Sequence, residues 1–448
     1  MDLSTTTSDN HSIDISFTDH HQNNVSSADQ ANNVSVPLLL QPSYARSKSL
    51  QHDELQNFRI SLKWCALDHS SCMGKFLSYL TFLFLTFFVP ILSSLFITVP
   101  SSAPDDDPVS FNKLVQIPES GLALIAFVTL LRFFRKYGLR QLLFLDGLQD
   151  DSVFVRRGYS RDLDRGFRYL ACILLPSFFV EIAHKIIFFS TVSVSFPGIS
   201  PGIPLHSIMF ALVLASWVYR TGIFLLVCVL FRLTCELQIL RFEGLHKLFE
   251  GCESDAGVIF REHVRIKKQL SVTSHRYRFF IVASLVTITV SQMGALLLIL
   301  AYETNKSFFN SGDLLICSVV QLSGFFLCIL GAARITHRAQ GIVAIATRWH
   351  MIATSATARS DQGKCQADET LACEPGRGDS NSLDIFVSNP SQDPTSFQTR
   401  QALLAYLQHN NGGITLFGFA LDRGLLHTLF AFEFSLVLWV LSKVVVLS

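Results

Sequence analysis

The chain has 448 residues, of which 49% are hydrophobic and 12% aromatic, and its formal net charge is +1 at pH 7. A soluble fold of this size does not need so much apolar surface, and a near-neutral charge does not favour nucleic-acid binding. The composition therefore indicates an integral membrane protein, whose first partner is the lipid bilayer and which has no nucleic-acid partner.

The N-terminal segment 1–56 is rich in Ser, Asn, Asp, Thr and His, and we expect it to be a disordered cytosolic tail. The first apolar stretch begins near residue 76, which is too late for a signal peptide. Cys65 and Cys72 lie just before this stretch and are candidates for palmitoylation.

Seven apolar stretches are long enough to cross about 30 Å of hydrocarbon as helices. They lie at 76–98, 118–138, 168–191, 207–231, 279–301, 313–333 and 424–447. Five Lys or Arg residues precede the first stretch, and the long connecting segments 134–166, 234–278 and 334–413 hold seven, eight and seven. The short segments between them hold one, none and one. Because basic loops stay in the cytosol, the sequence predicts an all-α, seven-span protein with a cytosolic N-terminus and its C-terminus outside. This topology is the inverse of a G-protein-coupled receptor.

The cytosolic segments 232–250, 256–278, 334–351 and 396–409 place apolar residues at helical spacing. We therefore expect spans four to six to continue as helices into the cytosol, and a further helix to precede span seven. The segment 352–394 is rich in Ser, Asp, Gly and Thr and is predicted to be a disordered loop. The expected parts are thus the tail 1–56, spans one to six with their cytosolic helices at 57–351, the loop 352–394, and a cytosolic helix with span seven at 395–448.

Two features mark the outer side and the bends of the spans. Asn305 begins the sequon Asn-Lys-Ser in a predicted outside loop and is a glycosylation candidate. Pro90 and Pro176 lie inside spans one and three, where each should kink or loosen its helix.

Ionisable residues inside the spans are costly and therefore informative. Glu181, His184 and Lys185 lie in span three, and Arg220 lies in span four at a similar depth to Glu181. A Glu181–Arg220 pair would neutralise both charges, whereas Glu181 and Lys185 at spacing i, i+4 form a competing pair. A polar ligand pocket and a structural ion pair joining two helices both explain these charges.

No known catalytic or metal-binding motif is visible in the chain. Glu181 and His184 have a Glu-x-x-His spacing, but the further carboxylates of a metal site do not accompany them. The phosphate-binding glycine loop, the nucleophile elbow and the His-Glu-x-x-His motif do not occur. The sequence therefore predicts neither an enzyme nor a metal or cofactor site.

The last span carries polar residues on one face. Gly412 and Gly413 are expected to separate it from the cytosolic helix. Ser435, Trp439 and Ser442 follow one another at helical spacing, with Lys443 beside them. Such a stripe either lines a pore formed by several copies or packs inside its own subunit.

The entry to this span resembles a known family. The run 418–426, Gly-Phe-Ala-Leu-Asp-Arg-Gly-Leu-Leu, resembles the entry to the final helix of insect gustatory and odorant receptors. Over 55–448 the arrangement is similar to that of plant gustatory-receptor-like proteins, a domain family of unknown function distantly related to them. The insect proteins end in Thr-Tyr, five hydrophobic residues and Gln-Phe. Here the same spacing is occupied by Ser435-Leu436, residues 437–441 and Ser442-Lys443, without an identical flanking residue.

The resemblance implies a function and its residues. In the insect relatives the final helix lines the pore of a tetrameric cation channel gated by small molecules. It therefore implies a homotetrameric, chemoreceptor-like channel with Ser435, Trp439, Ser442 and Lys443 as pore-lining candidates. Four Lys443 ammonium groups around one axis would favour anions.

The relatives bind their ligand between spans two to six, in the outer halves. For the same region of this chain, position alone gives the candidates for a small organic ligand: His184, Lys185, Trp217, Tyr219 and Tyr302. The alternatives are a secondary transporter that uses Glu181, Lys185 and Arg220, or a non-conducting membrane scaffold whose cytosolic helices bind partners. We expect the plasma membrane as the location, with an endomembrane as the alternative.

Overall fold

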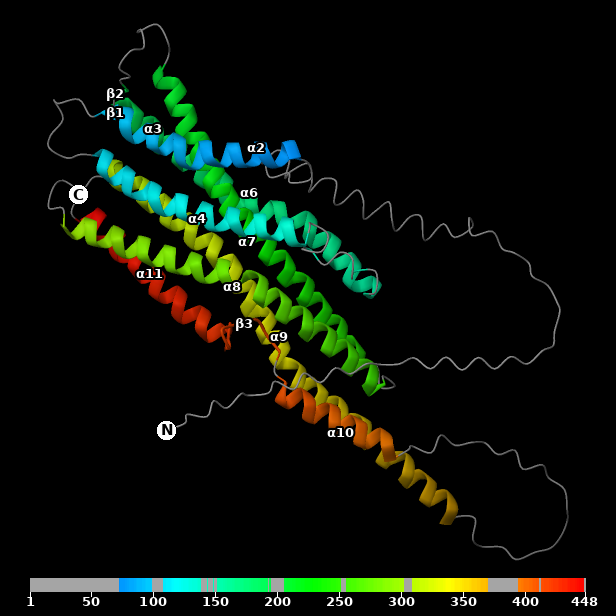
Figure 1. Cartoon of the computed structure of the whole chain (residues 1–448). Helices are drawn as coiled ribbons and strands as arrows, with labels where there is room; N and C mark the ends of the chain where they lie inside the picture. Colours follow the sequence, from blue (N-terminus) through cyan, green and yellow to red (C-terminus); the bar gives the residue numbers. More distant parts are fainter. Residues whose placement is uncertain are drawn as a thin grey trace, which may run out of the picture. The chain divides into compact units, whose positions relative to one another are not determined.

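A computed structural model of the chain describes residues 72–98, 108–137, 143, 148, 151–191, 193–194, 205–250, 255–301, 308–369, 394–410 and 412–446. All of these belong to one unit, residues 53–448. In chain order, the elements are α2 (Cys72–Leu83), the π-helical turn η2 (Phe84–Phe88), α3 (Val89–Phe96), β1 (Ile97–Thr98), α4 (Pro108–Lys136), α6 (Val153–Thr191), β2 (Ser193–Val194), α7 (Leu205–Glu250), α8 (Ala256–Ala301), α9 (Phe308–Glu369), α10 (Pro394–His409), β3 (Thr415–Leu416), β4 (Phe419–Ala420) and α11 (Arg423–Val446) (Figure 1).

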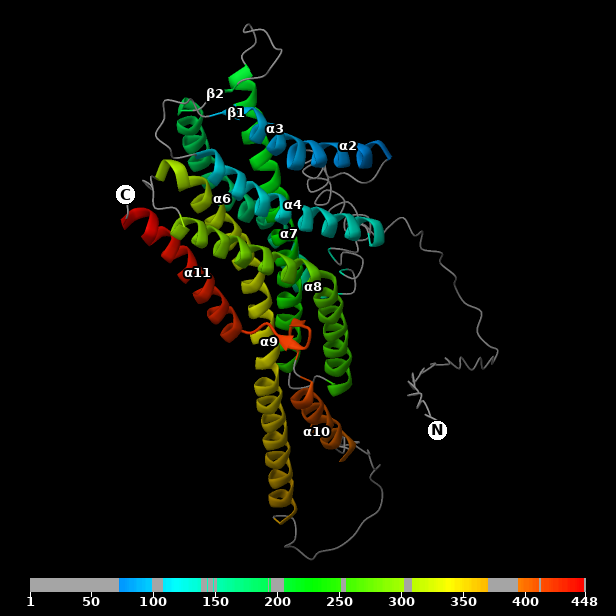
Figure 2. The ribbon, with the colours of Figure 1, turned by 60° about the vertical axis from the view of Figure 1, so that its left-hand side comes forward.

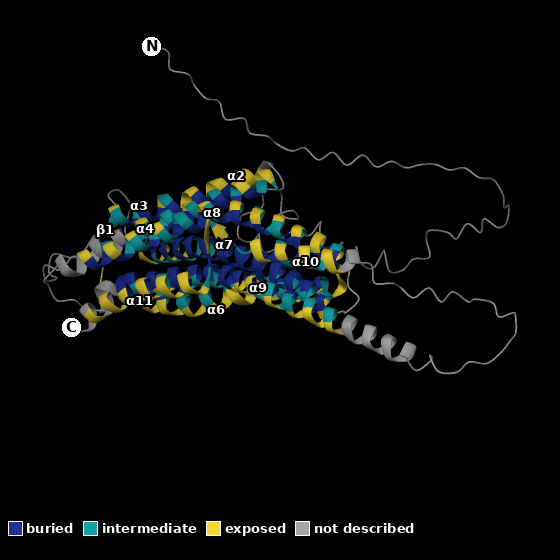
Figure 3. Ribbon diagram, turned by 90° about the horizontal axis from the view of Figure 1, so that it is seen from below, coloured by how far each residue is buried: buried dark blue, intermediate teal, exposed yellow. Residues whose placement is uncertain are grey.

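Helix α7 lies at the centre of the helical bundle. It contacts α4, α6, α8 and α9, and the views in Figures 1 and 2 show it crossing between them. Nearly every side chain between Ile223 and Gln238 is buried. In Figure 3 this part of α7 is dark blue, whereas the surrounding helices also carry exposed residues, drawn in yellow. A helix that is apolar on all sides belongs in the middle of a bundle, and the run Ile-Phe-Leu-Leu-Val-Cys-Val-Leu-Phe at 223–231 is of that kind.

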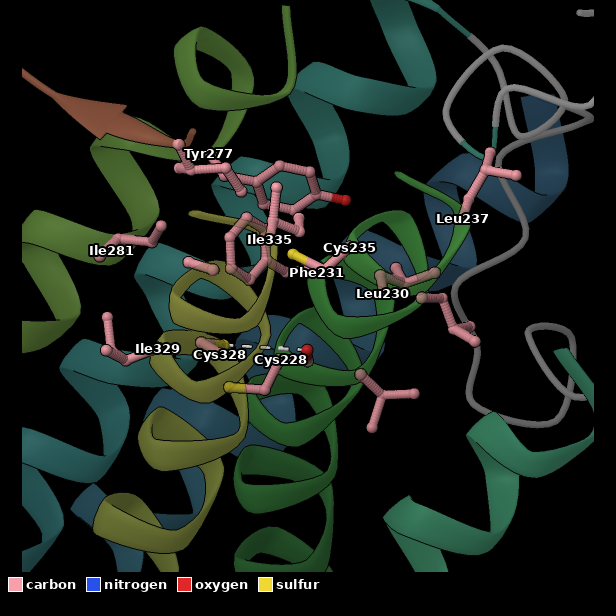
Figure 4. Packing of buried hydrophobic residues seen from close by; sticks show 14 of the residues in the cluster. Cys228, Leu230, Phe231, Cys235, Leu237, Tyr277, Ile281, Cys328, Ile329 and Ile335 are labelled. Carbon is pink, nitrogen blue, oxygen red and sulfur yellow. Dashed lines mark hydrogen bonds between the residues drawn. The ribbon is translucent and has the colours of Figure 1, made fainter. Parts of the chain in front are cut away.

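The core around α7 is closely packed. The ring of Phe231 lies 4.8 Å from that of Tyr277 on α8, centroid to centroid. The thiol of Cys328 on α9 donates to the carbonyl oxygen of Cys228, 3.8 Å away (Figure 4). Contacts of this kind join α7 to α8 and α9 in the apolar core.

Six helical segments of the described chain are long and apolar enough to cross a membrane. They are Met73–Phe96, Val115–Lys136, Val153–Thr191, Leu205–Glu250, Ala256–Leu297 and Gly312–Ser355. Several large apolar side chains on them are exposed, including Phe76 at 65% and Val290 at 65%. Such surfaces are stable against lipid and unfavourable in water. The seventh expected span corresponds to α11, which is not one of these six, so the number seven stays a prediction.

The predicted cytosolic helices are confirmed as helices. Helix α7 continues to Glu250, α8 begins at Ala256, and α10 runs beside α9. The predicted start of the loop 352–394 is wrong, because α9 continues to Glu369. This extension has four alanines and no proline, a composition that supports a helix. Residues 370–393 and the tail 1–56 lie outside the described residues.

Near Pro90, where we expected the helix to be loosened, the chain changes from an α-helix to a π-helical turn and back. The π-helical turn η2 lies just before this proline and separates α2 from α3. Proline has no N–H and clashes with the carbonyl four residues earlier, so nearby carbonyls lose their helical partners. Ser120 on α4 donates its hydroxyl to the Thr86 carbonyl (3.2 Å), and Ser216 on α7 donates to the Leu85 carbonyl (2.5 Å). Neighbouring helices thus satisfy the backbone that the proline disturbs.

Two short antiparallel strand pairings were not expected from the sequence. Strand β1 pairs antiparallel with β2, which joins the ends of α3 and α6. Strand β3 pairs with β4 between α10 and α11. The predicted break at Gly412 and Gly413 is confirmed, since α10 ends at His409 and Gly413 has a φ of 150°.

Candidate functional site

Six ionisable side chains are buried where α4, α6, α7 and α9 meet. Each is at most 8% exposed, and we call them the ionic cluster: Glu119, Glu181, His184, Lys185, Arg220 and Asp313. Moving an isolated charge from water into an apolar interior is very unfavourable, so such groups persist when they are paired and hydrogen-bonded. The pairing therefore shows what the cluster does to the fold.

Arg220 ties α7 to α4. Its Nη2 lies 3.1 Å from Oε2 of Glu119, and its Nη1 donates to the Gln116 carbonyl and to Ser120 Oγ, each at 3.3 Å. The other carboxylate oxygen of Glu119 accepts the thiol hydrogen of Cys317 on α9. Three helices therefore converge on one carboxylate.

Lys185 and His184 tie α6 to α9. The Lys185 Nζ lies 2.5 Å from Oδ2 of Asp313 and 3.6 Å from Oε1 of Glu181. His184 Nδ1 lies 2.6 Å from the other Asp313 oxygen. A Cβ on Gly312 would lie 2.5 Å from the imidazole, so a glycine at this position lets the histidine reach the start of α9.

The structure changes the expected pairing. The predicted Glu181–Arg220 pair is wrong, because Arg220 pairs with Glu119, while the competing Glu181–Lys185 pair is present. Glu119 and Asp313, the second and first residues of the predicted spans 118–138 and 313–333, were not among the expected site residues. An acidic residue at the edge of a span is the signal that would have found them.

A cavity of about 450 Å³ lies between α4, α8 and α9. Apolar side chains and glycines form most of its wall, with a few polar groups: Val115, Ile117, Pro118, Gly121, Val286, Thr287, Val290, Ser291, Gly294, Ala295, Leu314, Cys317, Ser318 and Gln321. Asp, Glu, Lys, Arg and His do not occur among these described lining residues. A mostly apolar cavity with a few polar groups is typical of a site for a small organic molecule.

The cavity borders the ionic cluster. Cys317 and Gln321 line both the cavity and a chamber of about 20 Å³ that Glu119, Trp217 and Arg220 also line. Of the ligand candidates that the structure describes, none lines the cavity of about 450 Å³ between α4, α8 and α9. A second hollow of about 470 Å³ lies between η2, α3 and α4.

The other candidate residues are distributed as follows. Trp217 is buried beside the ionic cluster, and Tyr219 is partly buried on α7. Tyr302 and Asn305 lie outside the described residues, so the glycosylation site and that ligand contact stay predictions.

Helix α11 has an inner and an outer face. Its inner face packs on α8 and α9 through Leu436 and Val437, and Thr289 of α8 donates its hydroxyl to the buried Glu433. Ser435, Trp439 and Ser442 are exposed, Trp439 at 52%. The predicted polar stripe therefore faces away from its own subunit. The side chain of Lys443 lies outside the described residues.

The long apolar helices and the charges buried between them define an integral multipass membrane protein, and its fold is that of an insect olfactory receptor. The structure of olfactory receptor OR5 from Machilis hrabei matches with a TM-score of 0.50 and 12% identity, over 83% of this chain and 89% of that one. The same receptor in complex with eugenol matches with a TM-score of 0.48 and 12% identity, over 84% of this chain and 91% of that one. No curated protein matches the chain. The chain belongs to the family described as "Protein of unknown function (DUF3537)", which matches residues 53–432.

Proposed function

We propose that the protein is a chemoreceptor-like, ligand-gated ion channel in which four copies surround an axis formed by α11. The observation that carries this proposal is the outer face of α11, where Ser435, Trp439 and Ser442 are exposed while the opposite face packs on α8 and α9. The olfactory-receptor fold over most of the chain supports it.

The chemistry of this face suits a shared pore. Ser435 donates its hydroxyl hydrogen to the Phe432 carbonyl oxygen of the same helix at 2.7 Å, so the hydroxyl has a hydrogen-bond partner even where it faces lipid. In a pore, the lone pairs of its oxygen would still be able to bind water or ions. Trp439 would form a constriction in a narrow pore, and a ring of four Lys443 ammonium groups would attract anions. The proposed channel therefore selects anions.

Two of the helices that line the cavity contact the proposed pore helix. The cavity lies between α4, α8 and α9, and both α8 and α9 contact α11. A ligand that binds better when these helices move apart would shift the position of α11, because a ligand favours the state to which it binds more tightly. Ligand binding and pore opening are thus coupled through one layer of helices.

The test is reconstitution of the full chain in planar bilayers with a library of small organic ligands. Ligand-evoked, anion-selective currents are expected, and Lys443→Glu should move the reversal potential toward that of cations. Lys268→Glu is the matched control. It makes the same change at an exposed residue near the N-terminal end of α8, and it should leave selectivity unchanged. Bilayers that never conduct would contradict the proposal.

A secondary transporter is the second candidate, and the ionic cluster favours it, since charges buried between membrane helices are common in ion-coupled carriers. It predicts solute flux without single-channel currents, abolished by Lys185→Met. A non-conducting scaffold predicts instead that Trp439 and Lys443 can be replaced without effect. Glycan mapping at Asn305 tests the proposed orientation, and the plasma membrane remains the proposed location.

A further inference from the structure

We propose that the cavity between α4, α8 and α9 selects neutral ligands that donate a hydrogen bond, with the side-chain oxygen of Gln321 as the acceptor. This inference takes from the proposed function the idea that the cavity is the ligand site, and it does not need the protein to conduct ions.

A chain of hydrogen bonds orients Gln321. Its Nε2 donates to Cys317 Sγ at 3.4 Å, and the Cys317 thiol donates to Glu119, whose other oxygen is held by Arg220 at 3.1 Å. The amide nitrogen is therefore turned toward Cys317, and Gln321 stands in the cavity wall with its carbonyl oxygen still able to accept a hydrogen bond.

The Gln321 oxygen lacks a partner among the described residues. The residue is 5% exposed, and its Oε1 accepts no hydrogen bond from them. A buried carbonyl without a donor is costly, so a ligand that supplies the missing donor gains affinity that an acceptor-only ligand does not.

Two of the three hydroxyl side chains in the cavity wall, those of Ser318 and Thr287, do not reverse this preference. Ser318 donates to the Leu314 carbonyl at 2.7 Å, and Thr287 donates to the Ala283 carbonyl at 2.8 Å. Their hydrogens are already used, so these two side chains present oxygen lone pairs to the cavity.

The ligand should also be neutral. The described lining residues include no charged side chain, so a charged ligand would lose its hydration without gaining a counter-ion. Glu119 and Arg220, which lie behind Cys317 and Gln321, already neutralise each other. Small alcohols, phenols and aromatic N–H compounds have the required chemistry.

The experiment uses ligand pairs that differ in one donor: indole against N-methylindole, and benzyl alcohol against benzyl methyl ether. Binding to the purified full chain in detergent is measured by ligand-observed NMR titration. We expect the donor of each pair to bind about tenfold more tightly. Equal affinities within both pairs, or no binding of any of the four, would overturn the inference.

Variants locate the effect. Gln321→Met removes the acceptor at similar volume and should weaken donor binding about tenfold while leaving the methylated compounds unchanged. Gln292→Met makes the same change at a buried α8 glutamine that is absent from the cavity wall, and it should keep the preference. A donor preference that persists in Gln321→Met would overturn the assignment.

A cavity-filling variant tests the place of binding independently. A Cβ on Gly294 meets no atom within 4 Å, so Gly294→Leu should fit into the cavity and abolish binding of all four compounds. Gly341→Leu, at an equally open glycine of α9 away from the cavity, should bind them normally. Donor-selective binding by a protein that never conducts would contradict the channel proposal and leave this inference standing.

Discussion

Two basic side chains of the ionic cluster each meet an acid on another helix. Arg220 of α7 meets Glu119 of α4, and Lys185 of α6 meets Asp313 of α9. A buried ion pair contributes little net stability compared with an apolar pair of the same shape, but removing one partner leaves the other charge buried alone. These pairs therefore specify which helix faces which.

Removing Arg220 should destabilise the protein more than removing the whole pair. Arg220→Met leaves Glu119 buried without its cation and is expected to cost about 3–5 kcal/mol. Adding Glu119→Gln to that variant should recover most of the loss, because no buried charge then remains at the site. Unfolding of the purified chain in mixed micelles measures both, and strictly additive effects would show that the two residues do not interact.

Asp313 should matter more than Glu181, although both carboxylates approach Lys185. Asp313 lies 2.5 Å from the Lys185 ammonium and 2.6 Å from the His184 ring nitrogen, whereas Glu181 lies 3.6 Å from the ammonium. Asp313→Asn is therefore expected to cost about 3 kcal/mol and Glu181→Gln about 1 kcal/mol, in line with hydrogen bonds to charged groups. A larger loss in Glu181→Gln in the same unfolding assay would mean that Lys185 prefers the acid on its own helix.

Among the elements, the hairpin before α11 has the most demanding backbone. Phe417 and Gly418 both have positive φ, 50° and 91°, as a tight two-residue turn requires. The Arg278 guanidinium lies 4.5 Å from the centroid of the Phe417 ring, and Ser274 donates to the Thr415 carbonyl. Contacts with α8 thus hold the turn in a conformation that a phenylalanine rarely adopts.

Two nearby glycines should respond in opposite ways to alanine. Gly418→Ala places a Cβ at a positive φ and should lower stability by about 1 kcal/mol. Gly424 lies in the first turn of α11, where a Cβ meets Asp422 at an ordinary 3.6 Å, so Gly424→Ala should raise stability by up to about 1 kcal/mol. Thermal unfolding compares the two, and equal shifts would contradict the assigned turn.

The sequence predicted the elements better than their contacts. Span length and helical spacing are local properties, so the continuation of α7 to Glu250 and the break at Gly413 were predictable. The choice of Glu119 by Arg220 depends on how α4 and α7 are rotated about their axes, which residues 101 positions apart do not reveal locally. The acceptor Gln321 was missed for the same reason, because its role arises from Cys317 and Glu119 together.

At the scale of the whole molecule, the remaining question is what covers the outer face of α11. Leu436 and Val437 are buried against the same subunit, while Ser435 and Trp439 are exposed. A single copy leaves polar and aromatic groups together on a helix that otherwise suits lipid. In the proposed tetramer the same face meets its counterparts in the other copies around the axis.

Cysteine cross-linking tests this arrangement directly. Ser435→Cys places a thiol on the exposed face, and four helices around one axis would bring such thiols close enough for a bifunctional thiol reagent to join neighbouring copies. Each chain has one such thiol and can be joined to one neighbour only, so the expected result on a denaturing gel is a band of two chains. Val437→Cys, 6% exposed and turned toward its own subunit, is the matched control and should stay monomeric. A two-chain band from both variants would indicate random collision, and a two-chain band from neither would mean that lipid, rather than other copies of the chain, covers the outer face of α11.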